Sequence, residues 1–140
     1  MTYINLKGRE IPLLYTTYEM KVIQEDIGQI SRAISLVTGR NPDDEKDQSK
    51  FGGAEHLECV AKMIRILGNA GLEENGEAAD LTEKKILRAL RPTELADAVN
   101  ACMEAMNEGM RSEIPAKKAE PGEKVDVTLE EIEKKKERES

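Results

Sequence analysis

The first fifteen residues alternate between apolar and polar side chains with a period of two. Apolar residues occupy every second position on both sides of the pair Lys7-Gly8, namely Ile4, Leu6, Ile11 and Leu13. This pattern is typical of a half-buried β-hairpin over about residues 2–15, in which Gly8 supplies the positive φ of the bend. Because lysine is uncommon at the start of a tight turn, a three-residue turn with a bulge is an alternative, and the register stays open by one residue.

A helical period follows the hairpin. Thr16 or Thr17 can cap this helix, and Glu19 lies in its first turn, where an acidic side chain suits the positive helix end. Its apolar residues are spaced alternately by three and four positions: Met20, Ile23, Ile27, Ile30, Ile34 and Val37. That heptad spacing predicts one helix of about five turns ending at Gly39. Val22, Ala33 and Leu36 widen the stripe, so the helix could face both a core and a partner.

Three more helical segments are expected further along. Polar residues 40–53 form a connection whose acids, Asp43, Asp44, Glu45 and Asp47, lack the ligand spacing of a calcium loop. A helix then runs from Ala54 to about Ala70 and stops at Gly71. Leu81-Thr82-Glu83 opens a short helix with Ile86, Leu87 and Leu90 inward, residues 91–94 break it, and the last stripe is Leu95, Val99, Cys102 and Met106.

From Glu113 the chain is densely charged, and we expect it to be largely disordered, with a short helix possible from Thr128. The predicted fold is therefore mainly α. It is a small domain of about four helices with an N-terminal β-hairpin over residues 1–112, followed by a flexible charged tail over residues 113–140.

Composition narrows the classes of function. The 140 residues suit one domain, and their net charge of -7 has the wrong sign for neutralising phosphates, so nucleic acid is not expected as a partner. The start of the chain lacks the pattern of a signal peptide, and no apolar run approaches the roughly 20 residues of a membrane span. We therefore expect a cytoplasmic protein that makes no use of a membrane.

Residues that could carry chemistry are few. His56 and Cys59 are three apart and could share a helix face, but a zinc site needs three or four ligands, so a surface histidine beside a core cysteine is expected. Cys59 and Cys102 both fall in apolar stripes, which favours buried thiols over a disulfide. The tight turn before the last helix suggests a DNA-binding helix-turn-helix, yet the exposed side of that helix is acidic. We expect no cofactor, no metal and no enzymatic activity.

The order of these elements resembles a known family. A hairpin reading Ile4 to Leu13, INLKGREIPL, runs into Tyr15-Thr16 and a long helix; a leucine-rich helix, the segment LTEKKILRALRPTEL (residues 81–95), a final helix and a charged tail follow. This layout is similar to that of the tail assembly chaperones of long-tailed bacteriophages and prophages. The resemblance covers roughly residues 2–112.

The resemblance implies a non-enzymatic protein of the bacterial cytoplasm that is absent from the finished virion. Such chaperones bind the long, helical tape measure protein and help recruit tail tube subunits. Some also have a longer form made by ribosomal frameshifting, for which the codons of Lys134-Lys135-Lys136 would be suited. A structural tail or connector subunit and a host helical adaptor protein are the alternatives.

An apolar groove between amphipathic helices could hold a client helix through residues spaced i, i+3, i+4 and i+7. Flexible methionines suit such a groove, although ordinary core packing explains them equally well. The residues expected to contact a partner are Val22, Leu36, Met103, Met106 and Met110, and self-association through the stripe from Ile23 to Val37 is a further possibility.

Overall fold

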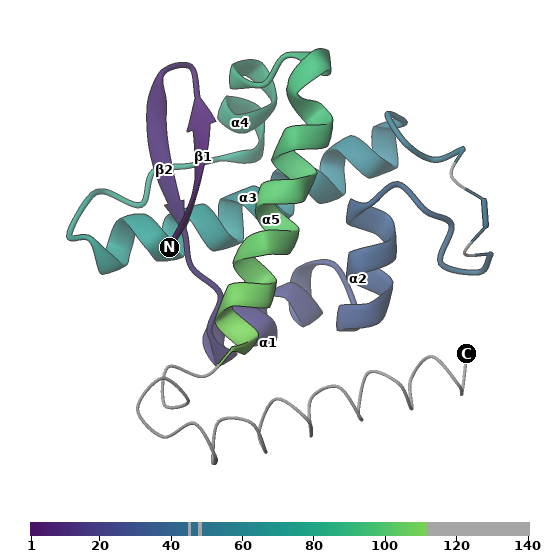
Figure 1. Cartoon of the computed structure of the whole chain (residues 1–140), viewed down its shortest axis with the longest axis horizontal. Helices are drawn as coiled ribbons and strands as arrows, with labels where there is room; N and C mark the ends of the chain where they lie inside the picture. The colour runs from purple at the N-terminus through teal and green to yellow at the C-terminus, as the bar shows by residue number, and fades with distance from the viewer. Residues whose placement is uncertain (45, 48, 112–140) are drawn as a thin grey trace. The chain divides into compact units, whose positions relative to one another are not determined.

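The computed structural model describes residues 1–44, 46–47 and 49–111. The chain divides into two units, Met1–Glu108 and Gly109–Ser140, and the fold described here is that of the first. The predicted disorder of residues 113–140 and the helix from Thr128 lie outside the described residues. The elements, in chain order, are strands β1 (Thr2–Leu6) and β2 (Arg9–Leu13), helices α1 (Thr17–Asp26), α2 (Ile30–Val37), α3 (Ala54–Glu74) and α4 (Glu83–Ala89), a 3-10 turn at Pro92–Glu94, and helix α5 (Leu95–Met110) (Figure 1).

The predicted mainly α fold with an N-terminal hairpin is confirmed, with five α-helices in the described part of the chain. The hairpin closes through a two-residue turn, since Lys7 and Gly8 both have positive φ, 53° and 81°. The side-chain oxygen of Asn5 accepts a hydrogen bond from the Gly8 amide at 2.8 Å, which helps hold Lys7 in this uncommon conformation. Ile4 therefore pairs with Ile11, and the bulged alternative is wrong.

The prediction of one long helix from Thr17 to Val37 is also wrong, because the chain breaks between α1 and α2. Gly28 has a φ of 141°, and the amides of Ile27 and Gly28 both donate to the carbonyl of Ile23, at 2.8 and 3.1 Å. Both bonds go to one carbonyl group in the last turn of α1, as at the end of a helix that a glycine terminates. The N-terminal prediction was sounder: Thr16 is the N-cap, and the carboxylate of Glu19 accepts hydrogen bonds from its amide and its hydroxyl.

The break changes which residues of the heptad stripe are buried. Ile23 and Val37 are fully buried, whereas Met20 and Ile34 are 36% and 37% exposed. The stripe is thus two short apolar faces that meet the core at different angles. It does not form one continuous seam for a second helix.

Helix α3 is the central element, and it continues past the glycine predicted to end it. Gly71 lies inside α3 and is buried, because β2 passes directly against it: a Cβ at this position would lie 1.9 Å from the carbonyl oxygen of Pro12. The contact is extended by the Leu14 amide, which donates to the carbonyl of Leu67 at 3.0 Å. The missing side chain of Gly71 therefore serves close packing of the hairpin, and it does not mark a helix end.

One apolar core joins the hairpin, α1, α2, α3, α4 and α5. Its fully buried members include Ile11, Ile23, Val37, Met63, Ile64, Leu67, Leu72, Ile86 and Cys102. In α4 the expectation was right for Ile86, but Leu87 is 38% exposed, because a helix of two turns has only one narrow face to bury. Thr82 caps this helix by accepting from the Lys85 amide at 3.2 Å.

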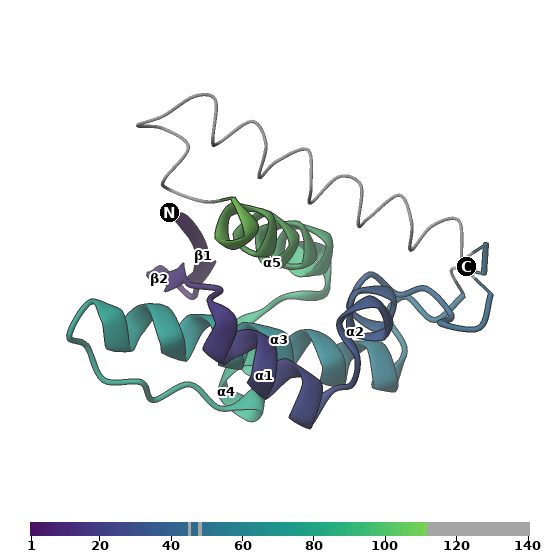
Figure 2. The ribbon, with the colours of Figure 1, turned by 90° about the horizontal axis from the view of Figure 1, so that it is seen from below.

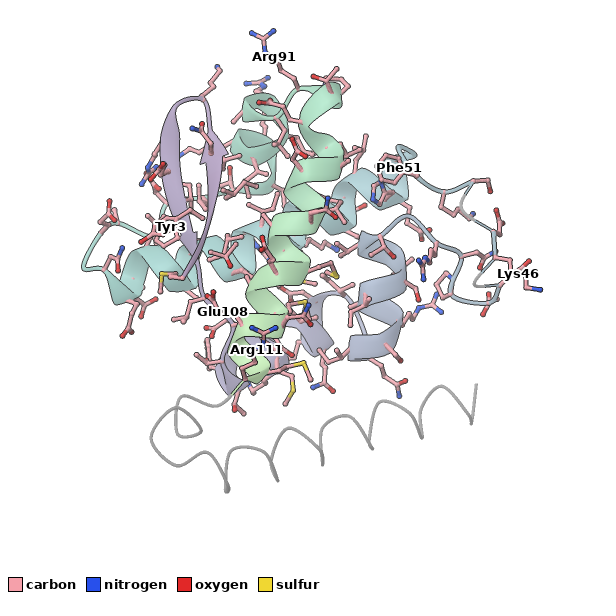
Figure 3. The ribbon with its side chains drawn as sticks, in the orientation of Figure 1. Tyr3, Lys46, Phe51, Arg91, Glu108 and Arg111 are labelled. Carbon is pink, nitrogen blue, oxygen red and sulfur yellow. The ribbon has the colours of Figure 1, made fainter. Side chains whose placement is uncertain are left out.

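His56 is buried, contrary to its predicted place on the surface, with only 1% of its area exposed. Its Nε2 lies 2.7 Å from the carbonyl oxygen of Val37, and its Nδ1 accepts a hydrogen bond from the Gly52 amide at 2.9 Å. Because Nδ1 is an acceptor, the proton of the neutral ring sits on Nε2 and is donated to Val37. The ring of Phe51, labelled in Figure 3, packs against the His56 ring. The two ring centroids are 4.6 Å apart. His56 thus ties the end of α2 and the end of the polar connection to the first turn of α3.

Replacing His56 with Ala should lower the free energy of unfolding by about 3 kcal/mol, because two buried backbone groups lose their partner and a cavity opens. The free energy of unfolding of His56→Asn should lie between those of the wild type and His56→Ala. Its side-chain amide can replace Nδ1 as the partner of Gly52, but it is too short to reach Val37 as well. Chemical denaturation followed by circular dichroism measures the effect. A loss below about 0.5 kcal/mol for His56→Ala would contradict this structural role.

Candidate functional site

The candidate site is a surface groove between α1 and α3, which pack against each other (Figure 2). Its volume is about 320 Å³, and its lining residues are Tyr18, Val22 and Asp26 from α1 and Arg65, Ile66, Asn69, Ala70 and Glu73 from α3. On each helix the lining positions span nine residues at helical spacing, so the groove is about 12 Å long, or two helical turns. It matches two turns of a third helix in length.

The groove is apolar at its base and polar at its edges. Ile66 is buried and Val22 and Ala70 are half-buried, while Tyr18 stands 66% exposed. A helix that placed two apolar side chains against this base would remove apolar surface on both partners from water.

Charged side chains hold the two helices in place around the groove. The guanidinium of Arg65 lies 2.5 Å from the carboxylate of Asp26 and 3.8 Å from that of Glu83, while Lys62 reaches the Asp26 carbonyl at 3.4 Å. The side chain of Asn69 bonds both the amide and the carbonyl of Leu81, at 3.0 and 3.1 Å. These contacts tie α3 to α1 through Asp26 and to the start of α4 through Leu81 and Glu83.

The structure does not gather the five predicted partner residues into one surface. Val22 lies in the groove, and Met103 is half-buried against the core. Leu36 and Met106 are buried, with 8% and 3% exposed, so they are core residues and do not fit a contact surface. Met110, near the end of α5, is 39% exposed. Stripe geometry identified apolar positions correctly, but it could not tell which of them the other helices cover.

Tyr18 and Ile66 are groove residues that sequence reasoning missed. Tyr18 lies four residues before Val22 on α1, and residues at this spacing share a helix face. The sequence therefore held a signal that Tyr18 belongs with Val22. Ile66 belongs to the apolar pattern of α3, which does not show by itself whether a residue faces the core or α1. Its pairing with α1 depends on how the two helices cross.

Both thiols are free and buried. Burial raises the pKa of the Cys59 thiol, and it raises that of Cys102 to about 12. Because only the thiolate is a good nucleophile or metal ligand, neither cysteine offers reactive chemistry at neutral pH. In the described part of the chain, no three His, Cys, Asp or Glu side chains come together in a way that could hold a metal ion.

The raised pKa of Cys102 predicts a loss of stability at high pH. Below the unfolded-state pKa of about 9, the folded and the unfolded chain both keep the thiol proton of Cys102. Between about pH 9 and pH 12 only the unfolded chain releases it, so the free energy of unfolding falls by up to about 1.4 kcal/mol per pH unit. Denaturation at pH 8.5 and 10.5 with reductant should therefore show a larger alkaline loss for the wild type than for Cys102→Ala. Equal losses would contradict a buried neutral thiol.

No protein-family model, curated protein or solved structure matches the chain. Within the residues that the structure describes, none of the helices combines the length and the apolar character needed to span a membrane.

Proposed function

We propose that this protein is a tail assembly chaperone of a long-tailed bacteriophage or prophage, which holds a helical segment of the tape measure protein in the groove between α1 and α3. The observation that carries the proposal is this groove with its half-buried Val22 and exposed Tyr18. The order of elements, a hairpin followed by amphipathic helices and a charged tail, is the resemblance that supports this class of client.

The groove suits a helix better than a small substrate. It is two turns long and at the small end of the roughly 300–1,000 Å³ typical of ligand pockets. Tyr18 can pack its ring on a client side chain and keep its hydroxyl in water, which is a common use of tyrosine at interfaces. A net charge of -7 helps to keep an assembly intermediate soluble, and it favours clients with basic segments next to the apolar anchors.

The test is co-expression of the full chain with the tape measure protein encoded nearest to it, followed by co-purification from the soluble fraction. The tape measure protein should be soluble only in the presence of this chain. Val22→Asp should abolish this effect and Tyr18→Ala should weaken it, because each removes apolar contact in the groove. Leu87→Ala on α4 is the matched control, since it shortens an exposed apolar side chain away from the groove.

Each outcome points to a different class of protein. If the tape measure protein stays insoluble while this chain alone forms rings or tubes and is found in purified virions, it is a structural subunit. A gene outside a tail-gene cluster, with no effect on the tape measure protein, would favour the host adaptor. If solubility depends on the chain but not on Val22 or Tyr18, the chaperone function stands and the groove is the wrong site.

A further inference from the structure

A second groove runs along the outer edge of the hairpin. It has a volume of about 180 Å³ and is lined by Tyr3, Ile4 and Asn5 of β1 and by Leu90, Glu94, Asp97, Ala98 and Ala101 of the segment that ends in α5. The three β1 residues are consecutive, whereas the face of a strand would be lined by alternate residues. The groove therefore follows the edge of β1 on the side away from β2. In Figure 1 this is the edge of β1 that faces α5.

The register of the hairpin leaves backbone groups unpaired along this edge. The two-residue turn makes Leu6 and Arg9 a hydrogen-bonded pair. Since hydrogen-bonded and non-hydrogen-bonded pairs alternate along an antiparallel ladder, Ile4 and Ile11 form the next hydrogen-bonded pair. The amide and carbonyl groups of Tyr3 and Asn5 therefore point away from β2. None of the further hydrogen bonds among the described residues takes up these groups. An exposed strand edge of this kind is a template for pairing with another extended segment.

The helical wall of the groove is acidic, since it includes Glu94 and Asp97. Near the start of β1, the Thr2 amide donates to the Glu108 carboxylate at 3.1 Å, and the terminal ammonium lies 3.6 Å from it. Of the two acidic lining residues, Glu94 accepts a hydrogen bond from the Arg91 amide, and the described ion pairs include neither Glu94 nor Asp97. Figure 3 shows the Arg91 side chain pointing outward from the molecule, so it does not cover this wall.

From this arrangement we propose that the edge of β1 binds a short extended segment of another protein that carries lysine or arginine. The segment adds a strand to the hairpin through Tyr3 and Asn5, and its basic side chains lie against Asp97 and Glu94. A second copy of this chain fits poorly, because pairing two β1 edges would bring the same acidic residues of both copies together. The distance from Tyr3 to Asn5 along β1 limits the site to about three or four residues.

This inference does not depend on the proposed function, because it uses a different surface and a different kind of client segment. It can be tested on the full chain with a capped seven-residue peptide that alternates lysine and valine. The expected result is saturable binding, with the largest changes in amide chemical shift at Tyr3 and Asn5. A peptide that alternates glutamate and valine is the control for charge at equal strand propensity.

Two variants separate backbone pairing from charge. Tyr3→Pro removes one amide that points away from β2 and leaves the bonds to β2 intact. Proline is already accepted at the opposite position, Pro12, for the same reason. Tyr3→Val keeps the amide and is the control. Binding should fall at least about tenfold in Tyr3→Pro and little in Tyr3→Val. Asp97→Lys should also weaken binding about tenfold, while Glu77→Lys, an equal charge change on the exposed connection before α4, should not.

Circular dichroism establishes that each variant is folded, and Asp97→Lys tests the proposal even if Tyr3→Pro does not fold. Equal binding of the two peptides, or binding that Asp97→Lys leaves unchanged, would overturn it. So would slow hydrogen exchange at the Tyr3 and Asn5 amides before any peptide is added, because the edge would then already be occupied by the chain itself or by a second copy.

Discussion

Replacing Gly71 with Ala should destabilise the protein by at least about 3 kcal/mol, although alanine is the better helix former by about 1 kcal/mol. The new Cβ would lie 1.9 Å from the carbonyl oxygen and 2.5 Å from the carbonyl carbon of Pro12. These are backbone atoms of β2, which cannot rotate away as a side chain could. The hairpin would have to move off α3, and the contacts of Ile11 and Leu13 with the core would loosen.

Urea denaturation of Gly71→Ala measures this loss, and Gly68→Ala is the matched variant one turn earlier in the same helix. A Cβ at Gly68 would meet the Cδ1 of Leu81 at 2.6 Å, the end of a flexible side chain that can change rotamer. We therefore expect Gly68→Ala to cost less than half as much. A rise in stability for Gly71→Ala would mean that helix propensity dominates and that β2 does not pack as closely as the structure has it.

Ile23→Asp should leave the chain unfolded at room temperature. Ile23 is fully buried where α1 meets the core, and placing a carboxylate there with no partner costs about 5 kcal/mol or more, which is comparable with the whole stability of a domain this size. Ile34→Asp changes a residue of the same heptad stripe, yet it should cost no more than about 1 kcal/mol, because Ile34 is 37% exposed.

The comparison of these two variants tests the break at Gly28. A continuous helix with one buried stripe would lose its fold in both cases, whereas a self-association seam would leave both variants folded and monomeric. Far-ultraviolet circular dichroism and sedimentation separate these results. Ile23→Val, which removes one methylene group without adding charge, is the control for packing and should cost about 1 kcal/mol.

Local patterns were sufficient for much of the fold. Alternation around Lys7-Gly8 identified the hairpin, and Thr16 with Glu19, Thr82 and the Pro92 turn marked helix starts that the structure confirms. These signals work because the interaction that each describes is made within a few residues of the chain.

The errors share a cause. Gly28 breaks a helix and Gly71 does not, although both are glycines in an apolar helical pattern. Gly28 takes a φ of 141°, while Gly71 stays helical and makes room for Pro12, a residue that only the fold brings opposite it. His56 was misplaced for a similar reason, since its partners at Val37 and Gly52 come from segments that only the fold brings together.

The candidate site was less accessible to sequence reasoning than the fold. Val22, predicted from its place beside the apolar stripe, lies in the groove, whereas Leu36 and Met106 look equivalent in sequence and are covered by other elements. Whether an apolar side chain is core or surface is a property of the packed helices together.

By itself, the sequence determined the mainly α fold with its N-terminal hairpin, the place of the hairpin turn, several helix starts and the acidic charge. Only the tertiary structure decided where the helix breaks, which apolar residues remain at the surface, and that grooves form between α1 and α3 and along the edge of β1. The physical reason is range: caps and turns are made by neighbours in the chain, whereas burial and grooves arise from contacts between residues far apart in it.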